Sequence, residues 1–392
     1  IWLRRLRKEG MYTMIYRDFQ DLKLSGLGMG AMRLPVIDGD DNKINAEAAE
    51  EMVAYAMGNG INYYDTAWGY HDGMSETVMG KVLSAYPRES FFLASKFPGY
   101  DLSNMGKAEE IFEKQLEKCG VEYFDFYLFH NVCEMNIDAY LDDARYGTYT
   151  YLKKQKENGR IRHLGFSAHG AYSVIERFLQ AYGRDMEFCQ LQLNYLDWTF
   201  QDAKAKVELA RSYGLPVWVM EPLRGGKLAS LPADAESKLK ALRPQESIPA
   251  WAFRFLQTVP DVCVTLSGMS DFEQVKQNIA TFEEDLPLSE REWDALQEIA
   301  REMTGKKTLP CTACRYCTSH CPKGLDIPEL IKLYNEHSFT GGGFIAPMRI
   351  GTLPEEKRPG ACIGCRSCER VCPQQIKISE MMKDFAARLQ QG

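Results

Sequence analysis

One pattern recurs along roughly the first 300 residues of this chain: an amphipathic stretch, a Gly, and then a short apolar run. Gly readily takes the left-handed conformation that ends a helix, and a short apolar run is typical of a buried strand. The pattern occurs at MGNGINYYDT, EKCGVEYFDFYLFH, KENGRIRHLGFS, QAYGRDMEFCQLQLNY and RSYGLPVWVMEP. Three further apolar runs, SGLGMGAMRL, SFFLASK and DVCVTLSGM, bring the expected strands to eight.

The alternation of strands with helical segments predicts a (β/α)8 barrel, an α/β fold that usually needs about 250 residues. Segments 46–58 and 106–119 are two of the expected helices. A doubly wound sheet is the alternative, but it would prefer a Gly-x-Gly-x-x-Gly turn after the first strand, and GLGMGAM does not match that motif. We therefore expect the barrel to occupy residues 14–303.

The composition of the chain excludes several classes of protein. With 392 residues, 45% of them hydrophobic, the chain can bury a large core and form one big domain plus a small one. A net charge of -7 disfavours nucleic-acid binding. No apolar stretch reaches the roughly 18 to 20 residues of a membrane helix. We expect a cytoplasmic protein without membrane or nucleic-acid partners, in which residues 1–13 are an N-terminal extension.

Polar side chains follow the expected strands at their carboxyl ends. In a (β/α)8 barrel these ends meet at one mouth, where the active site lies. The residues concerned are Asp65, Tyr70, Lys96, His130, Ser167, Gln190 and Asn194, followed by the segment EPLRGGKL. The sequence therefore predicts an active site at the carboxyl ends of the strands.

Four of these side chains are suited to act on a carbonyl group. A Tyr has a pKa near 10, so it donates a proton readily only when a nearby cation stabilises its phenolate. Lys96 can supply that cation to Tyr70, and Asp65 can balance the charge of the lysine. His130 can hydrogen-bond to a substrate oxygen or relay a proton. This set predicts proton donation to a carbonyl oxygen, which hydride delivery to the carbonyl carbon requires.

The segment DTAWGYHDGMSETVMG resembles the signature of the aldo-keto reductase family, and Lys96 and His130 lie at strand ends where that family keeps them. The resemblance covers residues 14 to about 303. It implies a (β/α)8 barrel that binds NAD(P)H without a Rossmann motif and transfers a hydride to or from a carbonyl or alcohol. It also implies that Asp65, Tyr70, Lys96 and His130 form the catalytic tetrad, with Tyr70 as the general acid.

The same resemblance implies a set of nucleotide-binding residues. GFSAH is similar to the family's Gly-x-Ser-Asn motif, although Ala168 stands where Asn is common. NADP(H) is the expected nucleotide. NAD(H) is the alternative, because this segment lacks the Lys or Arg that often binds a 2′-phosphate, and Lys276 is the only base nearby. The implied contacts are Ser167, Gln190, Leu223, Gly225, Lys227, Gly268, Met269, Ser270, Gln274 and Asn278.

Eight of the twelve cysteines form two clusters near the end of the chain. Each cluster has the spacing C-x2-C-x2-C-x3-C-P, once at TLPCTACRYCTSHCPKG and again at GACIGCRSCERVCPQQ. Zinc is the alternative metal, but a zinc ion is usually bound by paired C-x2-C motifs that lie far apart in the sequence. The repeated spacing instead favours two [4Fe-4S] clusters.

Both motifs resemble those of bacterial two-cluster ferredoxins, in which the fourth Cys of each run ligates the other cluster. The resemblance implies a ferredoxin-like domain over residues 311–392, joined to the barrel by a linker at 304–310. One cluster would take Cys311, Cys314, Cys317 and Cys372, and the other would take Cys362, Cys365, Cys368 and Cys321.

Two functions remain open at this point. The first is an NAD(P)H-dependent enzyme acting on a small carbonyl or alcohol, whose iron-sulfur domain is structural or exchanges electrons with a one-electron redox partner. The second is an electron-transfer or redox-sensing module in which the barrel is a nucleotide-binding regulatory subunit. A hydride carries two electrons and each cluster passes one, so a flavin or similar group would be needed to connect the two directly.

Overall fold

The computed structural model describes residues 14–305 and 308–390. The chain divides into two compact units, Ile1–Leu296 and Gln297–Gly392, and each is described by itself. The expected N-terminal extension at 1–13 lies outside the described residues, as do residues 306–307 of the expected linker. No helix among the described residues is long and apolar enough to cross a membrane.

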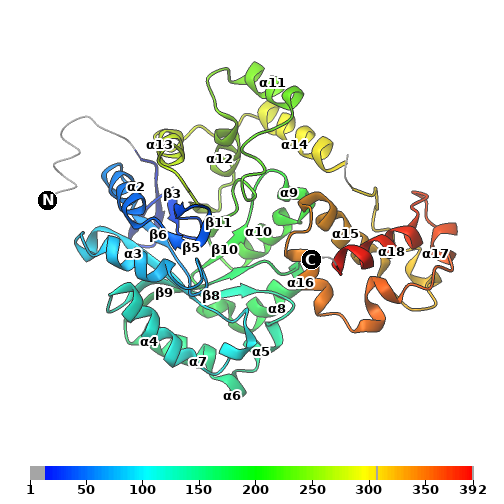
Figure 1. Ribbon diagram of the computed structural model, residues 1–392, viewed down its shortest axis with the longest axis horizontal. Coiled ribbons are helices and arrows are strands. Elements are labelled where there is room, and N and C mark those ends of the chain that lie inside the picture. Colours follow the sequence, from blue (N-terminus) through cyan, green and yellow to red (C-terminus); the bar gives the residue numbers. More distant parts are fainter. Residues whose placement is uncertain (1–13, 306–307, 391–392) are drawn as a thin grey trace. The chain divides into compact units, whose positions relative to one another are not determined.

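Eight parallel strands close into a barrel in the first unit, in the order β10-β11-β12-β3-β6-β7-β8-β9 (Figure 1). Each of the eight apolar runs expected to be a strand forms one of them. The strands are β3 (Leu27–Gly30), β6 (Tyr63–Asp65), β7 (Phe92–Phe97), β8 (Phe124–Val132), β9 (Ile161–Ala168), β10 (Phe188–Gln192), β11 (Val217–Met220) and β12 (Val262–Ser267). The predicted (β/α)8 architecture is confirmed.

Helices connect successive strands on the outside of the barrel (Figure 1). The helix expected at 46–58 is α2 (Ala46–Gly58), and the one expected at 106–119 is α4 (Ala108–Cys119). The other helices between strands are α3 (Ser75–Leu83), α5 (Ile137–Leu141), α6 (Asp143–Tyr146), α7 (Thr148–Glu157), α8 (Tyr172–Tyr182), α9 (Asp197–Phe200), α10 (Ala203–Ser212), α11 (Ala233–Leu242) and α12 (Ile248–Thr258). After the last strand come α13 (Phe272–Thr281) and α14 (Glu290–Gly305), which extends into the second unit.

The Gly residues of the recurring pattern do not all act as left-handed helix stops. Gly120 follows α4 with a φ of 62°, as expected. Gly183, however, has a φ of -56° and continues from α8 into a 3-10 turn. A Cβ at Gly183 would lie 2.7 Å from the ring of Tyr213, so this Gly serves close packing instead of chain reversal.

A hairpin of β1 (Tyr16–Phe19) and β2 (Leu22–Ser25) packs against the interior of the barrel at the amino ends of its strands. The ring of Phe19 lies 5.1 Å from that of Trp218 and 5.7 Å from that of Phe126, both near the start of their strands. With this end filled by aromatic side chains, the carboxyl ends of the strands are left for a site. A second hairpin, β4 (Val36–Ile37) with β5 (Asp40–Ile44), follows β3.

The second unit is built from helices and tight turns in its described part, residues 297–305 and 308–390. The segment DIPELIKLYNE begins α15 (Ile327–Thr340), where the Asp326 side chain accepts a hydrogen bond from the Glu329 N–H. The helices α16 (Ile345–Gly351), α17 (Ser367–Arg370) and α18 (Ile378–Leu389) complete the unit. Its buried core includes Cys317 from the first cysteine motif and Cys368 from the second.

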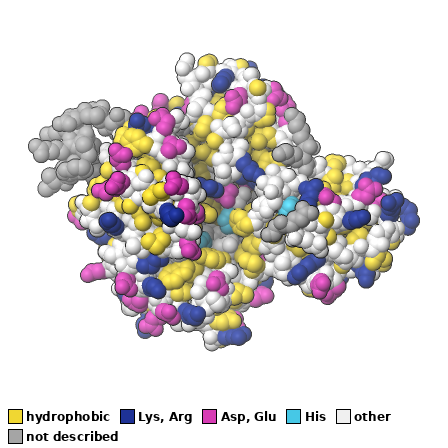
Figure 2. All heavy atoms as spheres, viewed as in Figure 1, with side chains coloured by type: hydrophobic (Ala, Val, Ile, Leu, Met, Phe, Trp, Pro, Cys, Tyr) yellow, Lys and Arg dark blue, Asp and Glu magenta, His cyan; other side chains and the backbone are white. Residues whose placement is uncertain are grey.

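The two units carry opposite net charge. Residues 297–392 contain 14 Lys and Arg against 10 Asp and Glu, whereas the rest of the chain contains 33 against 44. Figure 2 shows acidic side chains scattered widely over the barrel and basic ones spread over the second unit. The amino-acid side chains of the second unit are therefore basic on balance, although the net charge of the whole chain is negative.

Candidate functional site

The four residues expected to form a catalytic set come together at the carboxyl ends of adjacent strands. Asp65 is the last residue of β6, Lys96 lies near the end of β7, and His130 lies in β8. Tyr70 follows β6 in the connection to α3. Asp65 and Lys96 are both buried, so their charges interact with little screening by water.

Lys96 is the centre of the set. Its ammonium donates to Asp65 Oδ1 at 2.6 Å, to the Thr66 carbonyl at 2.8 Å and to the Tyr70 hydroxyl at 3.3 Å. It also lies 4.8 Å from the centre of the Tyr70 ring. The three donors of this ammonium are therefore fully used, and one of them is aimed at the Tyr70 hydroxyl.

Burial sets the direction of most pKa shifts at the site. Burial raises the pKa of Asp65, against the opposing effect of Lys96. Burial alone would lower the pKa of Lys96, but Asp65 and Tyr70 together raise it, so the ammonium stays charged. Burial also raises the pKa of Tyr70 and outweighs the lowering effect of Lys96. In this structure Lys96 thus limits the upward shift of the Tyr70 pKa without reversing it.

His130 lies beside Tyr70 and is neutral. Its ring centre is 6.0 Å from that of Tyr70 and 5.1 Å from that of Tyr100. Burial, helped by the charge of Lys96, lowers the pKa of His130 well below its usual value. Its Nδ1 is buried and has no hydrogen-bond partner among the described residues. A neutral imidazole next to the Tyr70 ring can hydrogen-bond to a substrate oxygen.

A buried polar network behind the site was missed by the sequence analysis. Glu76 Oε1 accepts hydrogen bonds from Ser95 and from Gln115, each at 2.6 Å, and Gln115 also donates to the Lys96 carbonyl at 3.0 Å. Lys118 pairs with the other oxygen of Glu76 at 2.7 Å. The network fixes the backbone that carries Lys96. Glu76 lies in the segment DTAWGYHDGMSETVMG, and its place in this segment is the sequence feature that could have indicated its role.

His71 was also missed, and it holds the loop that carries Tyr70. Its Nε2 accepts a hydrogen bond from the Leu34 N–H at 3.0 Å, and its Nδ1 lies 2.8 Å from the Asp41 carbonyl. His71 has a φ of 52°, a conformation that is uncommon for residues other than Gly. The ring therefore connects the Tyr70 loop to the connection after β3 and to the β4-β5 hairpin.

The two residues expected to contact the nicotinamide amide lie on neighbouring strands. Ser167 in β9 accepts a hydrogen bond from the Asn131 N–H at 2.8 Å. Gln190 in β10 is buried, and its Oε1 has no hydrogen-bond partner among the described residues. An unsatisfied buried amide oxygen needs a donor, and the carboxamide NH2 of a nicotinamide is a donor of the right kind. The expected residue therefore fits the expected group.

The loop after β11 contains Leu223, Gly225 and Lys227. Arg224, which the sequence analysis did not select, is buried there, and its Nε donates to the two carboxylate oxygens of Asp197 at 2.9 and 3.0 Å. Gly225 has a φ of 64°, so the backbone at this position is in the left-handed region that favours Gly. The pair Arg224 and Asp197 anchors this loop to the connection after β10.

The segment expected to hold the adenosine side follows β12. Gly268 and Met269 lead to the start of α13, where the Ser270 N–H donates to Gln274 Oε1 at 3.0 Å. Met269 is buried. Asn278 donates to the Ser267 hydroxyl at 3.1 Å. These polar side chains therefore also stabilise the segment itself.

Arg33, in the loop after β3, lies between the loop after β11 and the segment after β12. The sequence analysis did not indicate this residue as part of the site. A Cβ added to Gly268 would lie 3.2 to 3.4 Å from the Cβ, Cγ and Cδ of Arg33. A Cβ added to Gly225 would lie 3.4 Å from the Nη2 of Arg33. The guanidinium is exposed. It has no hydrogen bond or salt bridge among the described residues. The sequence signal was its position directly after the first strand.

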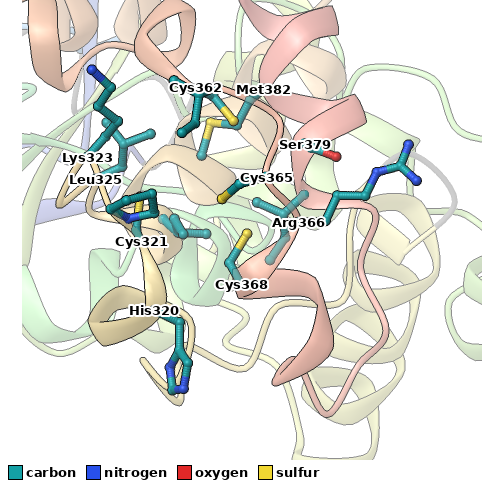
Figure 3. A pocket seen from close by; sticks show the side chains of 14 residues that line it. His320, Cys321, Lys323, Leu325, Cys362, Cys365, Arg366, Cys368, Ser379 and Met382 are labelled. Atoms are coloured by element: carbon teal, nitrogen blue, oxygen red, sulfur yellow. The ribbon is translucent and has the colours of Figure 1, made fainter.

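The eight cysteines line two cavities in the second unit. Cys321, Cys362, Cys365 and Cys368 line one, with an empty volume of about 350 Å³ that includes open solvent. Figure 3 shows that these four side chains surround a common space. The fourth Cys of the first run thus lies with the first three of the second run.

The other cavity, of about 310 Å³, is lined by Cys311, Cys314, Cys317 and Cys372. It has the reciprocal composition, three cysteines of the first run and the last of the second. Thiolates are the ligands of iron-sulfur clusters, and four thiols that line one space provide the ligands of one cluster. The eight cysteines therefore separate into the two sets that the ferredoxin resemblance implies.

A closed (β/α)8 barrel with a buried lysine, carboxylate and tyrosine at its mouth, followed by two four-cysteine cavities, defines a barrel oxidoreductase with an iron-sulfur domain. Residues 26–301 match the model of the aldo/keto reductase family, so the chain belongs to that family. Residues 310–378 match the model of the 4Fe-4S dicluster domain. The expected fold and both family resemblances are confirmed.

Known relatives cover the barrel part of the chain. An NADH-specific methylglyoxal reductase of Escherichia coli is 26% identical over an alignment of 329 residues, and the match covers 72% of this chain and 97% of that protein. An L-galactose dehydrogenase of Arabidopsis thaliana is 26% identical and covers 67% of this chain and 86% of its own length.

Among solved structures, an aldo-keto reductase from Bacillus halodurans in its holo form is 25% identical, with a TM-score of 0.59, over 73% of this chain and 96% of that one. An aldo-keto reductase from Klebsiella pneumoniae in complex with NADPH is 19% identical, with a TM-score of 0.58, over 74% of this chain and 95% of its own. The second likeness shows a shared fold.

Proposed function

We propose that this chain is an NAD(P)H-dependent oxidoreductase that transfers a hydride to or from a small carbonyl compound or alcohol, with Tyr70 as the general acid. One observation carries the proposal. The buried Lys96 ammonium is held by Asp65 at 2.6 Å and donates to the Tyr70 hydroxyl at 3.3 Å. This arrangement provides a proton donor and a cation that stabilises the phenolate left behind.

The bound nucleotide supplies the hydride. The Tyr70 hydroxyl donates a hydrogen bond to the carbonyl oxygen and transfers its proton as negative charge develops there. Lys96 stabilises the resulting phenolate, and Asp65 keeps the ammonium in place. The neutral His130 orients the same oxygen by a second hydrogen bond. Burial of these groups strengthens each of these interactions, because it removes competing water.

Several residues favour a bound nicotinamide nucleotide. Gln190 offers an unsatisfied buried amide oxygen, and the adjacent Ser167 lies in the neighbouring strand. Gly225 lies beside the exposed Arg33 guanidinium, which suits phosphate groups, and Gly268 lies beside the aliphatic part of the same side chain. The relatives include both an NADH-specific reductase and an NADPH complex. We propose NADP(H) as the nucleotide, since Arg33 adds a cation near the adenosine-side segment.

We further propose that the two sets of four cysteines each bind a [4Fe-4S] cluster. Iron-sulfur clusters pass single electrons. Because free thiols stay reduced in the cytoplasm, we propose that the protein is cytoplasmic. The clusters are structural or exchange electrons with a partner.

The substitution Tyr70→Phe tests the enzymatic proposal. It removes only the hydroxyl and keeps the ring above Lys96. We expect reduction of a simple aldehyde to fall at least about a hundredfold, while nucleotide binding and the visible spectrum of the clusters remain. The matched control is Tyr100→Phe, which removes a neighbouring hydroxyl that has no role in the proposal.

Unchanged aldehyde reduction by Tyr70→Phe would contradict the assignment of the general acid. Wild-type protein that binds nucleotide and carries clusters, but reduces or oxidises nothing in a panel of aldehydes, ketones and alcohols, would instead support a redox-sensing module.

A further inference from the structure

The surroundings of the two cysteine cavities differ in charge. Lys323 and Arg366 line the cavity that contains Cys321 and Cys365. Neither side chain makes a hydrogen bond or salt bridge with any other described residue. In Figure 3 the two side chains extend in different directions from the cysteines between them. Two positive side chains without a salt bridge among the described residues therefore lie at the edge of this cavity.

The second cavity has no such pair. Its one Lys or Arg among the described lining residues is Arg315, and this guanidinium is bound to Asp326 at 2.8 Å. The carboxylate neutralises the charge locally. Both cavities expose a cysteine to solvent, Cys365 in the first and Cys314 in the second. Only the first has a Lys and an Arg in its lining that form no salt bridge among the described residues.

The first cavity also has an apolar side chain on its exposed edge. Ile363 lines it and is 61% exposed. An exposed apolar centre with charged groups around it is typical of protein contact surfaces. The charged groups guide the approach of a partner of opposite charge, and the apolar centre excludes water once contact is made.

We infer that Lys323, Ile363 and Arg366 form the docking surface for a small acidic one-electron carrier protein, which exchanges electrons with the cluster held by Cys321, Cys362, Cys365 and Cys368. One electron passes between carrier and cluster in each encounter, and no bond or proton is exchanged. The barrel is acidic and offers no comparable attraction. This inference rests on the proposed function only in requiring that the clusters are present.

Charge reversal at the surface provides the test. The double variant Lys323→Glu/Arg366→Glu is compared with Lys377→Glu/Lys383→Glu, which changes the net charge equally at two exposed positions that line neither cavity. Arg315→Glu tests the second cavity. The probe is an acidic plant-type [2Fe-2S] ferredoxin, and its dissociation constant for the full chain is measured by calorimetry at low ionic strength and in 0.5 M salt.

We expect the wild-type protein to bind the ferredoxin at low ionic strength and to lose most of that affinity in 0.5 M salt, because salt screens exposed charges. Lys323→Glu/Arg366→Glu should weaken binding at least about tenfold. The other two variants should weaken it less than threefold. Stopped-flow reduction of the clusters by the reduced ferredoxin should slow in parallel.

Three outcomes would overturn the inference: no binding of the ferredoxin by cluster-loaded wild-type protein, equal losses in all three variants, or a loss confined to Arg315→Glu. Preferential binding of anionic lipid vesicles would overturn it as well. Iron and sulfide are measured on every sample, so that failure of the proposed cluster content is distinguished from failure of the docking surface.

Discussion

Lys96→Met is the most informative change at the barrel mouth, because it removes one charge and keeps most of the side-chain volume. Lys96 Nζ lies 3.3 Å from the Tyr70 hydroxyl. Two unit charges 4 Å apart interact by about 4 kcal/mol at an effective dielectric constant of 20. Even when part of this is lost to solvation and rearrangement, about 2.7 kcal/mol of stabilisation of the phenolate corresponds to a hundredfold in rate. We therefore expect kcat/KM for an aldehyde to fall at least about a hundredfold, with the fold intact.

Lys96→Met also removes the positive charge that pairs with the buried carboxylate of Asp65. Removing one partner of a buried ion pair typically costs about 3 to 5 kcal/mol. Burial raises the pKa of Asp65, and Lys96 opposes that shift, so in the variant the pKa rises further. A group whose pKa is raised on folding favours the folded state at low pH and loses that contribution as the pH rises through the folded-state pKa. The stability deficit of Lys96→Met should therefore be larger at pH 8 than at pH 5.

Arg88→Met is the matched control. Arg88 pairs with the buried Asp125 at 2.5 Å, at the amino end of β8 and away from Tyr70. It should lower the free energy of unfolding without a comparable loss of turnover. Single-turnover hydride transfer, nucleotide affinity and urea unfolding at both pH values are measured for the two variants. Near-normal turnover by Lys96→Met with nucleotide bound would refute the reasoning.

Three further predictions concern the nucleotide, the clusters and the packing of the barrel. Arg33→Ala should raise the KM for the nucleotide at least about tenfold with little change in kcat, because it removes a charge-assisted phosphate contact; an unchanged KM would contradict that role. Anaerobically prepared protein should contain about eight iron and eight sulfide per chain, and Cys314→Ser/Cys365→Ser should damage both clusters while NAD(P)H-dependent aldehyde reduction survives; two zinc ions without sulfide would contradict this cofactor assignment. Gly80→Ala should lower the free energy of unfolding by about 1 to 3 kcal/mol, since its Cβ would lie 2.5 Å from the Cys119 carbonyl oxygen, whereas Gly58→Ala, with no atom within 4 Å, should not.

The positions of the barrel strands could be predicted from sequence because the information is local. Each strand is a short apolar run, and most carboxyl ends carry a polar residue that the barrel brings to the same mouth. The placement of Asp65 beside Lys96 follows from strand order alone, since β6 and β7 are neighbours. The spacing of the cysteines is equally local and indicated the chemistry of the second unit.

Contacts between distant segments could not be predicted in this way. Arg33 lies beside Gly225 and Gly268 because barrel closure brings the loops after the first, seventh and eighth barrel strands together. The Tyr70 loop is held by His71, whose partners come from the connection after β3 and the β4-β5 hairpin. Nothing in the local sequence pattern indicates such partners.

The sequence by itself therefore determined the barrel, the residues at the strand ends and the two cysteine motifs, because periodicity and ligand spacing are properties of short segments. Only the tertiary structure decided which charges are compensated. Burial raises the pKa of Tyr70 more than Lys96 lowers it. Asp326 neutralises Arg315, whereas Lys323 and Arg366 remain without a salt bridge among the described residues. These differences depend on side-chain distances and exclusion of water, which are fixed only when segments far apart in the chain pack together.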